Sequence, residues 1–211
     1  MDRYCGSKWS RAVIVRDLSV TLIDLPYEVT RQLTVPQAIR LADLHLVLQA
    51  AFGWGNSHMF DFSSGTGRTG HRWFKIDHGW FSNEFDHEIK TATLTDVLAT
   101  LGKLKSFTYA YDMGDNWEHD LRPGKERVAA AGEAVIALQA ATGNCPPDDS
   151  GGAPGFSYML DCLDDPTSDE REDYLEWLGG VAFDRSADVA ALTLRVAAVA
   201  RKLAKRYPAA G

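Results

Sequence analysis

Cysteine is scarce in this sequence, and its spacing excludes several kinds of site. The three cysteines among the 211 residues are Cys5, Cys145 and Cys162, and no CxxC pair occurs. A zinc ribbon and a thioredoxin-type motif are therefore excluded, and reduced thiols in a reducing compartment are expected.

Long apolar runs are missing as well. The sequence has no stretch of about eighteen apolar residues, so no transmembrane helix is expected. Its first residues, MDRYC, lack the apolar core of a signal peptide. We therefore expect a cytoplasmic protein that does not enter a membrane.

Phosphate-binding features and an excess of positive charge are also absent. No GxxxxGK[ST] loop occurs, and the glycine-rich stretch 65–70 lacks the lysine and the following helix that a phosphate loop requires. The formal charge is −7, and basic residues gather only near the C-terminus. Since net negative charge repels a phosphate backbone, nucleic acid is disfavoured as a partner.

Apolar periodicity and turn residues predict hairpins that alternate with single helices. Strands are predicted at residues 12–23, 27–35, 58–62, 72–76, 106–112 and 117–122. Helices are predicted at residues 37–52, 93–101, 155–163, 168–178 and 187–206. Thr34 as a cap and Pro36 in the first turn favour the start of the first helix, and Gly53 favours its end. Thr93 is predicted to cap the second helix.

The resulting order is ββαββαββ followed by helices. This order predicts the α+β class, with a mixed, mostly antiparallel sheet and helices packed on it. A length of 211 residues is short for two cores, so a single domain is expected. Residues 63–90 are predicted as a long hairpin or loop, and the alanine-rich stretch 128–142 as a helix interrupted by Gly132.

Three motifs follow one another in the middle of the chain. They are the stretch 44–62 with FGW and HMFDF, the stretch YAYDMGDNWEH at 109–119, and CPPDDSGG at 145–152, trailed by GF, WLG and FD up to residue 184. In this order they resemble the plasmid pRiA4b ORF-3-like family over about residues 12–184. The resemblance implies an α+β fold and occurrence in bacterial chromosomes, plasmids and mobile elements, and it implies no activity.

The sequence departs from the family pattern at two places. Relatives usually carry a PPIWRR-like stretch before the second strand, where this chain has LPYEVTR at 25–31. They also often carry a second cysteine where Ser150 stands. The missing cysteine argues against a shared cysteine-metal site in this chain.

The predicted hairpin at 112–119 concentrates groups that can ionise. Asp112, Asp115, Glu118 and His119 could hold a hard divalent metal or act as acid and base. The alternative is that both aspartates accept hydrogen bonds from turn amides, while His119 is a core or rim residue.

The loop CPPDDSGG is stiffened by prolines and contains glycines that allow a close backbone approach. Its Asp148 and Asp149 could face a ligand or the hairpin at 112–119. Cys145 could act as a nucleophile with His119 as its base, although an inert buried thiol is the more usual role. His45, alone on the first helix, is more typical of packing than of a ligand.

No complete catalytic group emerges from the sequence, so whether the protein is an enzyme stays open. Aromatic residues placed around a polar hairpin favour an interaction or small-ligand-binding domain, with a protein, a peptide or a small molecule as partner. These aromatic residues are Trp54, Tyr109, Tyr111 and Trp117. No cofactor is predicted on this interpretation.

The alternative hypothesis is a metal-dependent hydrolase. In it, the 112–119 hairpin meets the 145–152 loop and closes an acidic site. Asp112, Asp115 and His119 would hold a divalent metal there, with Asp148 and Asp149 nearby.

Overall fold

The computed structural model describes residues 12–65, 70–74 and 86–210. Its strands are β1 (Ile14–Leu22), β2 (Val29–Pro36), β3 (Phe60–Ser64), β4 (His71–Phe74), β5 (Asp86–Glu88), β6 (Phe107–Tyr111), β7 (Trp117–Val128) and β8 (Ala137–Thr142). These strands form one sheet in the order β5-β4-β3-β6-β7-β1-β2-β8. Neighbours are antiparallel except for β4 and β5, which run parallel.

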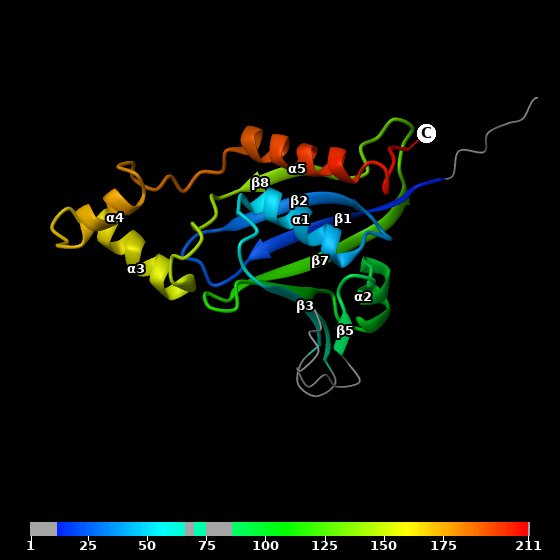
Figure 1. The fold of residues 1–211 in the computed structure, drawn as a ribbon, viewed down its shortest axis with the longest axis horizontal. Helices are drawn as coiled ribbons and strands as arrows, with labels where there is room; N and C mark the ends of the chain where they lie inside the picture. The colour runs from blue at the N-terminus through cyan, green and yellow to red at the C-terminus, as the bar shows by residue number, and fades with distance from the viewer. Residues whose placement is uncertain (1–11, 66–69, 75–85, 211) are drawn as a thin grey trace, which may run out of the picture.

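The helices are α1 (Leu41–Phe52), α2 (Leu94–Thr100), α3 (Gly152–Asp164), α4 (Arg171–Trp177) and α5 (Val189–Leu203). Figure 1 shows α1 in front of the sheet, α5 beside β8, and α3 and α4 projecting beyond one end of the sheet. The α+β class and the mixed, mostly antiparallel sheet are therefore confirmed. Within the described ranges, no helix has both the length and the apolar character needed to cross a bilayer.

Local capping signals predicted two helix ends correctly. Thr93 and Asp96 form a reciprocal capping box at the start of α2. Gly53 ends α1 with φ at 92°, a left-handed conformation that favours glycine.

The predicted start of the first helix was wrong. Thr34 and Pro36 belong to β2, which pairs with β1 along its whole length, and α1 begins only at Leu41. The Thr34 hydroxyl donates to Asp17 Oδ1 at 2.9 Å instead of capping a helix. Pairing with β1 outweighs the local capping pattern, because it satisfies the backbone polar groups of this segment.

The helix predicted over 128–142 was also wrong. Residues 137–142 form β8, which pairs with β2. Alanine favours a helix, but an unpaired β2 edge offers hydrogen bonds that outweigh this weak local preference. The sheet thus contains β5 and β8 in addition to the six predicted strands.

Residues 66–69 and 75–85 of the predicted loop at 63–90, together with Cys5, lie outside the described residues. The described remainder of that stretch contains the end of β3, then β4 and β5. Both described cysteines, Cys145 and Cys162, are buried free thiols.

The main core lies between the sheet and the helices. Leu44, Val47 and Leu48 of α1 are buried in it, as are Leu192 and Val196 of α5. Val189 of α5, in contrast, has an exposed side chain. It lies in the first turn of α5, before the stripe that contacts the core.

Arg31 of β2 is fully buried despite its charge. Its Nε donates to the carbonyl of Ala51 at 2.6 Å. Its Nη1 donates to the carbonyls of Thr30 and Thr142 at 2.7 Å and of Gly143 at 3.0 Å. One side chain therefore joins β2, the end of α1 and the end of β8.

The environment of Arg31 explains how a cation is tolerated there. Ala51 lies in the last turn of α1, where the helix dipole is negative. The guanidinium also lies 4.9 Å from the ring centroid of Phe52, in a cation–π geometry. Burial lowers the pKa of Arg31 from its ordinary value.

We expect Arg31→Lys to lower the free energy of unfolding by about 2–4 kcal/mol, because a lysine cannot satisfy the same set of buried carbonyls. Urea unfolding measures the change. The matched control is Arg122→Lys, whose side chain is 68% exposed. This control should change stability by no more than about 0.5 kcal/mol. Equal losses in the two variants would contradict the role given to Arg31.

Candidate functional site

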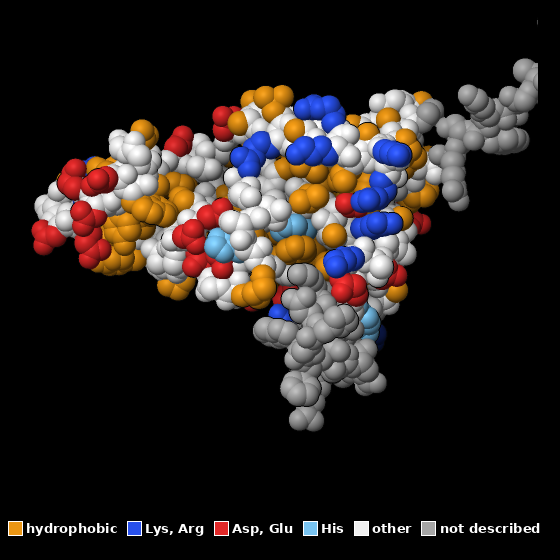
Figure 2. All heavy atoms as spheres, in the orientation of Figure 1, with side chains coloured by type: hydrophobic (Ala, Val, Ile, Leu, Met, Phe, Trp, Pro, Cys, Tyr) orange, Lys and Arg blue, Asp and Glu red, His pale blue; other side chains and the backbone are white. Residues whose placement is uncertain are grey.

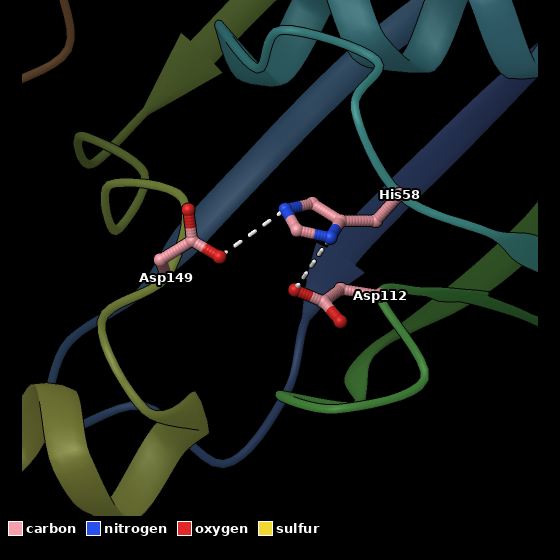
Figure 3. A group of neighbouring side chains, drawn as sticks. All are labelled: His58, Asp112 and Asp149. Atoms are coloured by element: carbon pink, nitrogen blue, oxygen red, sulfur yellow. Dashed lines mark ion pairs between the residues drawn. The ribbon is translucent and has the colours of Figure 1, made fainter.

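Three segments that are distant in sequence meet at one place on the surface. They are the segment 53–59 after α1, the turn 112–116 between β6 and β7, and the loop 145–151 before α3. Figure 3 shows His58, Asp112 and Asp149 converging, one from each segment. His58 Nδ1 lies 3.5 Å from Asp112 Oδ2, and His58 Nε2 lies 3.4 Å from Asp149 Oδ1.

The turn between β6 and β7 fixes Asp112. Its backbone N–H donates to the Met59 carbonyl at 2.8 Å, which joins the turn to the His58 segment. Its Oδ1 accepts from the backbone N–H groups of Gly114 at 2.8 Å and Asp115 at 3.4 Å. Asp112 therefore caps its own turn with one oxygen and presents the other to His58.

The loop 145–151 packs directly on this turn. Asp115 Oδ2 accepts from the Gly151 N–H at 3.1 Å. Gly152 has φ at 66°, and a Cβ there would lie 2.5 Å from the Asp115 carbonyl oxygen. Such a contact is possible only without a side chain, which explains the glycine at this position.

Asp148 joins the loop to the other two segments. Its Oδ1 accepts from the Tyr111 hydroxyl at 3.2 Å, and its Oδ2 from the Gly55 N–H at 3.3 Å. The Trp54 indole N–H donates to the Pro146 carbonyl at 2.9 Å. The proline-rich loop is therefore held against the hairpin by specific hydrogen bonds.

Backbone strain is concentrated at this junction. Asn56, Asp112, Asn116 and Asp149 all have positive φ, between 53° and 62°. Asparagine and aspartate tolerate this conformation better than other residues with a side chain. Such outliers gather at functional sites in many proteins, and here two of them, Asp112 and Asp149, direct their carboxylates at His58.

His119 does not take part in this group. Its side chain is fully buried, and its Nδ1 lies 3.1 Å from the Tyr109 carbonyl oxygen. The edge-on rings of Phe52 and Trp54 lie beside it, and burial lowers its pKa to about 3. The hypothesised metal set of Asp112, Asp115 and His119 is therefore not formed, because strand alternation turns His119 into the core.

The four aromatic residues that favoured a binding domain in the sequence are not exposed to a ligand. Trp54, Tyr109, Tyr111 and Trp117 are all buried. Their rings pack on one another and on His119, and they support the loop from beneath. The alternating aromatic residues of this hairpin thus form part of the core and do not line a binding site.

Two other candidate residues, His45 and Cys145, are buried among packed side chains. His45 is buried, with Nδ1 2.8 Å from the Tyr109 hydroxyl and its ring stacked on Phe60. Burial lowers the pKa of His45 to about 4. Burial also raises the pKa of Cys145 well above its ordinary value, which opposes formation of a nucleophilic thiolate.

The sequence interpretation missed His58. This residue was placed at the start of a predicted strand, but β3 begins only at Phe60 and His58 belongs to the preceding loop. Within the part of the chain that the structure describes, His58, Asp112 and Asp149 form the one group of three potential ligand residues whose donor atoms all lie within 4.8 Å of one another. The HMFDF motif was the available signal, because it ties His58 to the family pattern.

The close approach of Gly152 to Asp115 can be tested by substitution. We expect Gly152→Ala to lower the free energy of unfolding by clearly more than Gly132→Ala, as measured by urea unfolding. Both glycines have positive φ, 66° and 75°, but nothing lies within 4 Å of a Cβ at Gly132. The control therefore reports the left-handed backbone alone, at about 1–2 kcal/mol. Similar losses would show that the loop does not press on the turn.

The two buried histidines predict a dependence of stability on pH. Folding holds the pKa of His45 at about 4 and that of His119 at about 3, against an ordinary value of 6.5. The unfolded chain therefore binds more protons below pH 6.5, so their contribution is present above this pH and is lost as the pH falls. Each histidine should lower the free energy of unfolding by about 2 kcal/mol at pH 5 compared with pH 7.

Urea unfolding of the unmodified chain, His45→Gln and His119→Gln at both pH values measures this effect. Each variant should show a smaller drop in stability between pH 7 and pH 5 than the unmodified chain. An identical drop in all three proteins would refute the assignment.

Comparison with known proteins agrees with the resemblance noted from the motifs. Uncharacterized protein y4hQ of Sinorhizobium fredii is 38% identical over 177 residues, which cover 83% of this chain and 86% of that protein. The crystal structure of a protein of unknown function, MM3350 from Methanosarcina mazei Go1, matches with a TM-score of 0.71 and 27% identity, over 83% of this chain and 95% of that one. The family model described as plasmid pRiA4b ORF-3-like protein matches residues 15–191, and the chain belongs to this family.

Proposed function

We propose that this chain is a small-ligand-binding domain whose ligand is a divalent cation held by His58, Asp112 and Asp149. The observation that carries the proposal is the convergence of one imidazole and two carboxylates, within 4.8 Å of one another, from three separate segments. Imidazole and carboxylate together are ligands typical of Zn²⁺, Mn²⁺ and related ions.

The charge distribution supports a cation. Two carboxylates lie on either side of one imidazole, and Asp112 is largely buried. Carboxylates brought this close repel one another unless a positive charge lies between them. A metal ion between the two carboxylates would supply that charge.

A metal ion would take one ring nitrogen of His58 and one oxygen from each aspartate, since one donor atom from each of the three residues lies within 4.8 Å of the others. The turn amides that hold Asp112 Oδ1 keep its other oxygen directed at the site.

Hydrolysis is the second candidate function. Three protein ligands leave positions for water or substrate on an ion such as Zn²⁺, and bound water becomes a nucleophile near neutral pH. The Asp149 side chain is 74% exposed, so the site faces solvent. A phosphoester or an amide would be the natural substrate class. Association with plasmids or mobile elements rests on the family's name and stays a prediction.

Cation binding is tested in two ways. One is the Tm of the chain with Mn²⁺, Zn²⁺, Mg²⁺ or EDTA, and the other is the metal content of the purified protein. Binding to the folded state raises Tm by mass action, and an ion at 100 times its Kd stabilises by about 2.7 kcal/mol. Asp149→Asn should abolish the rise, since asparagine tolerates the positive φ but binds the ion poorly. Asp120→Asn, which changes a carboxylate paired with Arg122 elsewhere, should preserve it.

The proposal fails if none of the ions raises Tm and none copurifies with the chain. It also fails if Asp149→Asn and Asp120→Asn respond alike. In that case His58 only braces two loops through its contacts with Asp112 and Asp149, and His58→Gln should then lower Tm equally with and without EDTA.

A further inference from the structure

The charge of the chain is unevenly distributed. Residues 152–187, which include α3 and α4 and are called the arm below, carry nine acidic and two basic side chains. The acidic residues are Asp161, Asp164, Asp165, Asp169, Glu170, Glu172, Asp173, Glu176 and Asp184. The net charge of the arm therefore equals the formal charge of −7 of the whole chain. Figure 1 shows α3 and α4 projecting away from the sheet.

The arm also exposes large apolar side chains. Tyr158 is 52%, Trp177 50% and Val181 72% exposed, and α4 has no buried residue. Tyr158 is fixed by a hydrogen bond to Glu170 at 3.1 Å and by an edge-on contact with Tyr174. Figure 2 shows apolar and acidic side chains gathered together on this projection. Exposed tyrosine and tryptophan beside charges are typical of protein interfaces.

The outer face of α5 complements the acidic arm, because it combines basic side chains with an exposed apolar one. Arg201 and Lys202 of α5, and Lys205 two residues after its end, are exposed, and none has an ion-pair partner among the described residues. Leu194 of the same helix is 69% exposed. Arg206, in contrast, pairs with Asp43 of α1, so part of the basic cluster holds α5 on the fold.

These two surfaces cannot meet within one molecule as it is folded. The arm extends beyond one end of the sheet, while the C-terminal, basic end of α5 lies toward the other end (Figure 1). We propose that the arm of one copy docks on the outer face of α5 in a second copy. Acidic residues around Trp177 then face Arg201, Lys202 and Lys205, and the apolar side chains of both surfaces are removed from water.

The geometry of this contact has a consequence for the assembly. When one arm docks on one α5, the pair of copies keeps one free α5 and one free arm. These two surfaces either dock on each other, which closes a two-fold dimer, or add further copies to a ring or an open chain.

Sedimentation velocity of the full chain tests the proposal. At about 50 mM salt the unmodified chain should associate as its concentration rises, and at about 500 mM salt it should dissociate, because ions screen exposed charges. A chain that stays monomeric at about 0.5 mM protein in low salt would overturn the proposal, whatever the variants do.

Charge reversal identifies the surfaces. Asp173→Lys with Glu176→Lys on the arm, or Lys202→Glu with Lys205→Glu on α5, should each abolish self-association. Mixing these two variants should restore association, because each reversed surface meets a complementary one. Reversal of Lys103 and Lys105, exposed beyond α2, is the matched control and should change nothing. Failure of the mixture to associate, with both variants folded by Tm, would refute the proposed pairing.

Discussion

A buried guanidinium that has no carboxylate partner among the described residues joins three parts of the fold. Arg31 donates to carbonyls of β2, α1 and the end of β8, and its charge faces the negative end of the α1 dipole. A buried charge is costly unless its hydrogen bonds are made, so these carbonyls must stay where they are. The end of β8 is therefore fixed relative to α1, and the loop that follows β8 starts from a defined point.

That starting point determines where the candidate site can form. Gly143 has φ at 66°, and a Cβ there would lie 2.1 Å from the Glu28 carbonyl oxygen, so β8 ends in close contact with β2. The next residues contain the two prolines, whose fixed φ limits the paths open to the loop. The loop reaches the β6–β7 turn, where hydrogen bonds to Asp115 and from Tyr111 secure it. Asp149 then faces His58.

The sequence was informative where structure depends on neighbouring residues. The capping box at Thr93 and the left-handed glycine at position 53 are local arrangements, and both were predicted correctly. Thr34 and the alanine-rich stretch 128–142 were misassigned because strand partners far away in sequence outweigh local preference.

The candidate site shows the same limit. The sequence interpretation proposed that the acidic hairpin and the acidic loop meet, and they do, but it chose His119 where the structure places His58. Both histidines stand beside aromatic residues in family motifs, so composition cannot separate them. Strand register distinguishes the two histidines. Tyr109 and His119 are paired across β6 and β7, and both point into the core.

The continuity between the loop and α3 links the candidate site to the arm. Only Ser150 and Gly151 stand between Asp149 and the first residue of the arm, so the backbone that positions this carboxylate also begins the projecting helix. A contact that fixes the orientation of the arm would therefore alter the affinity of the three-residue group for an ion. Thermodynamic linkage requires the converse to the same degree: ion binding would change the affinity of the arm for whatever it contacts. The junction would then couple docking of the arm to ion binding at the candidate site.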